Sequence, residues 1–256
     1  MAEKCKMPLY TSLLGVQTKI GTKTMKKASS TLFVFVVFFY AHLSVAQDCG
    51  GYFNFKKGMK VEMTSYDKKD RPTAVTKYEV IDYKPVDGGT SLAFAHETYD
   101  AKGKLMAKSE SVGKCVDGDY HTDIRNISGD MMPKSPDMKV SITGDQMVYP
   151  RDLKVGDDLK DASINIKSGF EGGMTIMNMN ANITNRKVEA YETIETPAGK
   201  FDCAKLTYNM QMKFMGNRTL KCVEYLAKGI GLVKTEQFDA KGNRQAYMVV
   251  TKIEGQ

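Results

Sequence analysis

The sequence predicts an all-β fold, built as a strongly curved antiparallel sheet or half-open barrel of about ten strands. Two observations lead to this prediction. Apolar and polar residues alternate along several stretches after residue 46, and a period of two is typical of strands with one face in solvent. Short segments rich in Asp and Gly separate these stretches, as turns separate the strands of hairpins. Many antiparallel strands must close, curl or pack as two sheets to protect their edges, so a two-sheet β-sandwich is the alternative.

Three stretches show the alternation most clearly: residues 75–83, 90–99 and 205–214. In the last of these, every second side chain is apolar, and the residues between them are polar. Side chains two apart in a strand point to the same face, so this stretch predicts one wet and one apolar face. The apolar face would carry Leu206, Tyr208, Met210, Met212 and Phe214.

The expected turns follow a repeated pattern. Residues 66–71, 99–104 and 238–243 each read aromatic, Asp, any residue, Lys, then Gly or Asp, then a polar residue. The Asp side chain can accept hydrogen bonds from its own turn, and the Gly position tolerates a positive φ. We therefore expect a hairpin tip at each copy. The Pro-containing stretch around 131–160 breaks the pattern and is a candidate seam between subdomains.

Residues 25–46 are typical of a secretory signal peptide. Lys26 and Lys27 precede an apolar run of about ten residues, and small residues at 44–46 suit a cleavage site. The apolar run is too short for a transmembrane helix, which needs roughly 20 such residues. Gln47 and Asp48 precede Cys49, which does not fit lipoprotein processing. Residues 1–24 would then be a mis-assigned upstream extension, and residues 47–256 a single β-rich domain in the periplasm or outside the cell.

The net charge excludes one class of partner. Six of the 37 basic residues and one of the 30 acidic residues lie in the first 46 positions, which leaves a net charge of +2. The remaining charges are interspersed rather than gathered in a basic patch, so we expect no nucleic-acid binding.

Four cysteines follow the leader: Cys49, Cys115, Cys203 and Cys222. An even number in an exported chain predicts two structural disulfides, and four cysteines allow three connectivities. The spacing has no Cys-x-x-Cys pair, which argues against a redox site or a zinc knuckle.

Methionines supply the candidate binding residues. Fourteen of the 17 methionines follow residue 46, and two Met-x-Met pairs lie on expected strands. If the sheet curls, these flexible thioethers would line an apolar concavity that accepts a small apolar ligand, such as an acyl chain. The alternatives are a face that packs shut and a copper(I) site. The candidate ligand-binding residues are Met177, Met179, Met210, Met212 and Phe214.

No catalytic signature accompanies these residues. The chain has no Gly-x-Ser-x-Gly, His-Glu-x-x-His, phosphate loop or dinucleotide fingerprint. His121 and Asp123 are two apart on an expected strand, which is a weak basis for a catalytic dyad, and Asp157, Asp158 and Asp161 lack the spacing of a calcium loop. We therefore expect a non-enzyme with no cofactor, whose partner is an apolar small molecule or an envelope protein.

Four segments carry a family resemblance: residues 52–59, 149–158, 196–203 and 227–236. Together they resemble the TapB-like family of exported bacterial proteins, which is defined by a domain of unknown function. The resemblance covers most of residues 49–254. It implies a signal peptide, an all-β fold and a location in a Gram-negative cell envelope, and it brings no catalytic residues. Relatives prefer another residue where this chain has Cys222, so the resemblance favours the pairing of Cys49 with Cys115.

Overall fold

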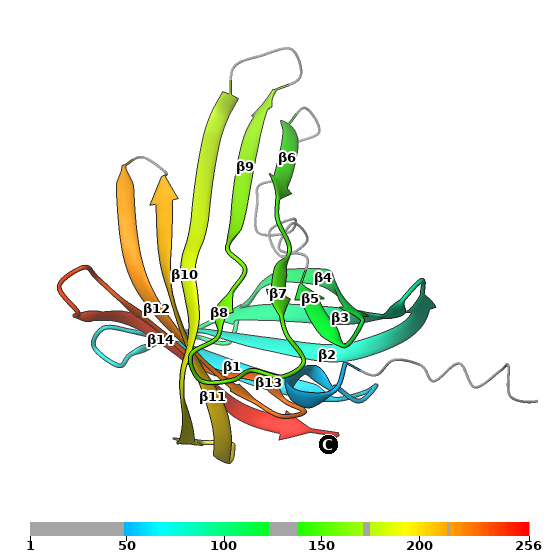
Figure 1. The fold of residues 1–256 in the computed structure, drawn as a ribbon. Coiled ribbons are helices and arrows are strands. Elements are labelled where there is room, and N and C mark those ends of the chain that lie inside the picture. The colour runs from blue at the N-terminus through cyan, green and yellow to red at the C-terminus, as the bar shows by residue number, and fades with distance from the viewer. Residues whose placement is uncertain (1–48, 123–137, 171–174, 214–215, 256) are drawn as a thin grey trace, which may run out of the picture. The chain divides into compact units, whose positions relative to one another are not determined.

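The computed structural model describes residues 49–122, 138–170, 175–213 and 216–255. These residues lie in one compact unit, Ala46–Gln256. They form a single antiparallel sheet and one 3-10 turn, so the all-β prediction is confirmed (Figure 1). The expected upstream extension and signal peptide, residues 1–46, lie outside the described residues.

The sheet is open, with β6 and β7 at its two ends in the order β6-β9-β10-β11-β12-β13-β14-β1-β2-β3-β4-β5-β7, while β8 pairs beside β10. All strands belong to this one sheet, so the described residues do not form the alternative two-sheet sandwich. The elements are η1 (Gly51–Phe53), β1 (Lys60–Asp67), β2 (Pro72–Val86), β3 (Gly89–Asp100), β4 (Leu105–Val116), β5 (Asp119–Thr122), β6 (Met138–Gly144), β7 (Met147–Tyr149), β8 (Asp158–Leu159), β9 (Ala162–Phe170), β10 (Thr175–Thr196), β11 (Gly199–Lys213), β12 (Asn217–Ala227), β13 (Gly231–Phe238) and β14 (Arg244–Glu254).

The number of strands differs from the prediction, because the sheet contains 14 strands rather than about ten. The extra strands fall where the sequence suggested loops. Three of them, β6, β7 and β8, come from the Pro-containing stretch around 131–160. Strands β7 and β8, of three and two residues, are too short to show an alternation. Both sides of the expected seam therefore contribute to the same sheet.

The three repeated turns form as the sequence predicts. Asp67 Oδ1 accepts hydrogen bonds from the backbone N–H groups of Lys69 and Arg71, at 2.8 and 3.0 Å. Asp100 and Asp239 do the same in their own turns, at 2.9 Å for each bond. The positions expected to have a positive φ have values of 58°, 81° and 84°. They are Asp70, Gly103 and Gly242.

Contacts between distant strands show that the sheet curls on itself. Strand β7 ends the sheet, and seven strands separate it from β12 in the strand order. The Tyr149 hydroxyl on β7 nevertheless donates a hydrogen bond to the Glu224 carboxyl on β12, at 3.1 Å. A flat sheet would hold these strands tens of ångströms apart, since neighbouring strands are about 4.8 Å apart. The sheet is therefore strongly curved, as expected.

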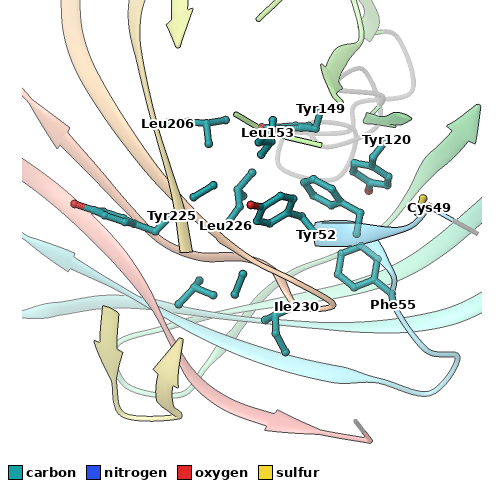
Figure 2. Packing of buried hydrophobic residues seen from close by; sticks show 14 of the residues in the cluster. Cys49, Tyr52, Phe55, Tyr120, Tyr149, Leu153, Leu206, Tyr225, Leu226 and Ile230 are labelled. Carbon is teal, nitrogen blue, oxygen red and sulfur yellow. The ribbon is translucent and has the colours of Figure 1, made fainter. Parts of the chain in front are cut away.

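Aromatic residues of the segment that precedes β1, residues 49–59, fill the interior of this curl. We call these residues the N-terminal segment. Tyr52, Phe53 and Phe55 are all buried, with exposed fractions below 9%. The Phe53 ring stacks on Tyr120 of β5, with ring centres 4.2 Å apart, and lies 5.0 Å from the Tyr149 ring. Figure 2 shows Tyr52 directed toward Leu226 at the centre of this cluster. The curled part of the sheet thus has a filled core.

A disulfide joins this segment to the sheet. Cys49 is bonded to Cys115 of β4, and both residues are buried. The bond fixes the start of the segment on β4, which lies between the strands that carry Phe94 and Tyr120, the ring partners of Phe55 and Phe53. The pairing is the one that the family resemblance favours.

Candidate functional site

Strands β10 and β11 bring the four candidate methionines onto one face. In the register of this pair, Met212 lies opposite Ala181 and Met210 lies opposite Ile183. Met177 and Met179 precede Ala181 at intervals of two, so their side chains lie on the same face as Met210 and Met212. All four are half-buried. We call this surface the methionine face.

The methionine face extends onto β9. Met179 lies opposite Ile166, and Ala181 lies opposite Ile164. The other face of the same strands is polar, with an asparagine at every second position from Asn178 to Asn182. This part of the sheet therefore has one apolar and one polar face, as the alternation predicts. The fifth candidate, Phe214, lies outside the described residues.

A buried polar cluster lies at the foot of the methionine face. Tyr208 is two residues from Met210 on β11, and its hydroxyl donates to Glu224 Oε1 at 2.9 Å. The Tyr149 hydroxyl donates to the other carboxyl oxygen of Glu224. Glu224 has an exposed fraction of 8%. Both of its oxygens therefore have hydroxyl donors, as a buried carboxyl group requires.

Arg186 is the cation of this cluster, with an exposed fraction of 2%. Its Nη1 donates to the carbonyl oxygens of Val148, at 3.1 Å, and Lys160, at 2.7 Å. Its guanidinium carbon lies 4.9 Å from the centre of the Tyr149 ring, a cation–π contact. Arg186 thus ties β7 and the residue that follows β8 to the long strand β10.

The environment shifts the acidities of this cluster. Burial raises the pKa of Glu224, while the Tyr208 hydroxyl and the Arg186 charge oppose the rise. Burial and the nearby Glu224 also raise the pKa values of Tyr149 and Tyr208. Both phenols therefore stay protonated and act as donors to the carboxyl group.

A β-bulge explains why sequence periodicity misses Arg186. The register of β10 shifts between Thr184 and Lys187, and Asn185 has a φ of 56°. Before the bulge the buried positions are odd-numbered, and after it they are even-numbered. Unbroken alternation from Ile183 would place Arg186 on the polar face. Alternation along β12 could have indicated Glu224, because this residue lies between the apolar residues Cys222 and Leu226 on the same face.

The expected second disulfide is absent, because Cys203 and Cys222 are free and buried. The register of β11 and β12 pairs Cys203 with Ala227 and Cys222 with Tyr208. The two cysteines are therefore five positions apart along the strands and on opposite faces, a separation of roughly 16 Å. A disulfide needs Cα atoms within about 7 Å of each other. Neighbouring strands alone do not make a disulfide.

The candidate catalytic and metal-binding residues show no assembled site. His121 is half-buried on β5, and Asp123 lies outside the described residues. His96 Nε2 lies 2.7 Å from Ser111 Oγ, and burial lowers the pKa of His96, but among the described residues no carboxyl group hydrogen-bonds to it. The Asp157 side chain accepts from the Lys154 N–H at 2.9 Å, so it caps its own loop. In the described part of the chain, no three His, Cys, Asp or Glu side chains gather as metal ligands.

The family model of the DUF3108-like proteins matches residues 56–250, from the residues before β1 into β14. The chain belongs to the DUF3108-like family. The matched range includes both the methionine face and the polar cluster. No curated protein sequence matches the chain.

Solved structures give the fold of this DUF3108-like chain a precedent. A candidate exported protein with a YmcC-like fold from Bacteroides fragilis is 23% identical, with a TM-score of 0.66. A candidate lipoprotein from Parabacteroides distasonis is 24% identical, with a TM-score of 0.67. Each match covers 81% of this chain and 100% of the other. The chain therefore has the YmcC-like fold. None of the helical residues that the structure describes forms a helix able to cross a membrane.

Proposed function

We propose that this DUF3108-like protein is a non-enzymatic protein of the bacterial envelope that binds an apolar chain on the methionine face. One observation carries the proposal: Met177, Met179, Met210 and Met212 share one face of two neighbouring strands and are all half-buried. Half-buried thioethers keep contact area available, and methionine adapts its shape to a flexible apolar partner.

The length of the methionine face suits an acyl chain. From Met177 to Ile183 the strand β10 advances six residues, which is about 20 Å at the usual rise of a strand. One leaflet of a bilayer holds acyl chains in a layer about 15 Å thick, half of the hydrocarbon core. A single extended acyl chain therefore fits along the strand.

The envelope location rests on the leader and on the structural relatives. Residues 25–46 carry the features of a secretory signal peptide. The two structural relatives are a candidate exported protein and a candidate lipoprotein. Membership of the narrower TapB-like family is part of the same proposal. An exported chain would meet acyl chains in the periplasm.

Native mass spectrometry of the full-length gene product, purified from a Gram-negative host, tests the proposal. We expect a co-purifying mass of acyl-chain size that organic extraction removes. Met179→Lys should lower the ligand occupancy about tenfold or more, because an ammonium group against a hydrocarbon chain loses its hydration. Met106→Lys is the matched control, since Met106 is exposed on the far hairpin. A bare mass in the wild type, or an equal loss in the control, contradicts the proposal.

A second candidate function is a structural or interaction module with a filled core. The aromatic residues of the N-terminal segment favour it, because Phe53 and Phe55 occupy the interior of the curl that a ligand would otherwise enter. Its partner would be another envelope protein. A bare wild-type mass together with a stable complex would favour this candidate.

A further inference from the structure

A separate cavity lies at the other end of the β10–β11 pair. Its volume is about 680 Å³, which is within the range of small-molecule sites. The lining comes from the C-terminal half of β10, the first residues of β11, the end of β12 and the N-terminal segment. Its lining residues include Tyr52, Tyr191, Lys200, Phe201, Asp202 and Lys228.

The four segments that carry the family resemblance meet at this cavity. Tyr52, Asp202 and Lys228 come from three of them and line the cavity. The fourth, residues 149–158, contributes Leu153, whose carbonyl oxygen accepts a hydrogen bond from the Tyr191 hydroxyl. Segments far apart in the sequence thus meet at one place. The polar lining found there is not needed to form the apolar core.

Two tyrosines form part of the cavity wall and differ in exposed fraction and in the hydrogen bonding of their hydroxyl groups. Tyr191 is 58% exposed, so one face of its ring is open, while its hydroxyl is held by Leu153. Tyr52 is 5% exposed, and its hydroxyl has no hydrogen-bond partner among the residues that the structure places. Burial and the nearby Tyr191 raise the pKa of Tyr52, so its phenol remains a donor. The wall therefore combines a stacking platform with an unused hydroxyl.

The charges of the lining balance. Lys200 and Lys228 line the cavity together with Glu192 and Asp202. Glu192 is bound by Lys205 at 2.8 Å, and Lys200 lies 3.5 Å from Glu195. Asp202 uses Oδ1 to accept from the Thr193 hydroxyl at 2.7 Å, which leaves its other oxygen for a ligand.

We propose that this cavity binds a neutral saccharide. A lining without net charge gives no advantage to an ionic ligand, which would lose its hydration without a matching countercharge. Sugar rings have C–H faces that pack on aromatic rings and hydroxyl groups that need both donors and acceptors. Tyr191 supplies the ring, Asp202 the acceptor and Lys228 the donor. The site is independent of the methionine face, which occupies the opposite halves of β10 and β11.

Isothermal titration of the full-length protein with three neutral trisaccharides, maltotriose, cellotriose and N,N′,N″-triacetylchitotriose, tests the proposal. We expect at least one of the three to bind. Tyr191→Ala should weaken that binding about tenfold by removing the stacking platform, whereas Tyr191→Phe keeps the ring and should stay within about threefold. Lys228→Ala, an exposed change that leaves the core intact, should weaken it about threefold. Leu105→Ala, on an exposed hairpin away from the cavity, should leave it unchanged.

Three results overturn the proposal. The first is that none of the three trisaccharides binds at concentrations up to about 10 mM, the weak limit for a specific site. Alternatively, Tyr191→Ala and Lys228→Ala both bind as tightly as the wild type while retaining the native circular dichroism spectrum. Preference for an acidic trisaccharide, such as trigalacturonate, would show that the lining selects charge and would equally overturn it.

Discussion

At the scale of single residues, Asn185 decides where the polar cluster lies. Its left-handed conformation shifts the register of β10 and turns Arg186 from the polar face to the interior. A charged residue is buried only where partners compensate it, and Arg186 has two carbonyl oxygens and the Tyr149 ring. Glu224 is compensated by two phenols. Burial still raises the pKa of the Glu224 carboxyl group, so the free energy of unfolding depends on pH.

We predict that the stability of the wild type falls with rising pH relative to Glu224→Gln. The folded-state pKa of Glu224 is raised by burial, so the folded protein holds this proton more tightly than the unfolded chain. The resulting stabilisation is complete below the ordinary glutamate pKa and is lost as the pH rises through the raised one. Denaturant unfolding at a series of pH values measures the difference. Parallel curves for the two proteins would refute the prediction, and Glu195→Gln, at an exposed site, is the control.

We also predict that the two free thiols are inert in the folded protein. Burial raises the pKa values of Cys203 and Cys222 to about 11. At pH 8 roughly one thiol in a thousand would then be ionised, and the thiolate is the reactive form. A thiol reagent should label neither cysteine in the native mature protein and both in denaturant. An intact mass four hydrogens below the reduced mass, instead of two, would show a second disulfide.

Local alternation predicts the methionine face because β10 is regular from Met177 to Ile183 and β11 from Cys203 to Lys213. The same reasoning fails at Arg186, because one residue with a positive φ reverses the faces of the residues after it, up to the next register shift between Val188 and Ala190. It fails for Cys203 and Cys222 because register is a property of two strands together. It also fails for β7 and β8, which are too short to show a period.

At the scale of elements, the N-terminal segment acts as part of the core. Its Phe53 ring contacts both Tyr120 and Tyr149. The backbone of the segment meets the β12–β13 turn, where Gly229 N–H donates to the Gly51 carbonyl at 2.9 Å. Gly231, the first residue of β13 after this turn, has a φ of 75° and lies so close to Phe55 that a Cβ would be 2.9 Å from its ring. The turn and the segment therefore fit together.

We predict that Phe53→Ala lowers the free energy of unfolding by about 3–5 kcal/mol, the usual cost of emptying a buried aromatic site. Phe170→Ala is the matched control, since Phe170 is 50% exposed, and it should cost less than about 0.5 kcal/mol. Urea denaturation followed by circular dichroism gives both values. Equal losses in the two variants would mean that the segment does not support the core.

Loss of the Cys49–Cys115 disulfide should also be costly. The bond closes a loop with a sequence separation of 66, for which the chain-entropy estimate is about 4 kcal/mol. In a variant with Cys49→Ala and Cys115→Ala, the free energy of unfolding measured in urea should be lower by that amount. A reducing agent should then have no further effect on the variant. If reduction leaves the stability of the wild type unchanged, the bond does not form in solution.

At the scale of the whole unit, the β10–β11 pair links two different surfaces. The first half of β10 and the last half of β11 form the methionine face. The last half of β10 and the first half of β11 line the cavity with Tyr191 and Phe201. The bulge at Asn185 lies between them and places the polar cluster at the junction. One pair of long strands therefore presents an apolar surface at one end and a polar, aromatic-walled cavity at the other.

The most direct test of the central claim is an NMR titration of the methyl-labelled methionines with a fatty acid such as laurate. We predict that the signals of Met177, Met179, Met210 and Met212 shift, while those of Met59 and Met63, which are buried in the core, do not. Shifts confined to other methionines, or no shifts at saturating laurate, would contradict the binding of an apolar chain on the methionine face.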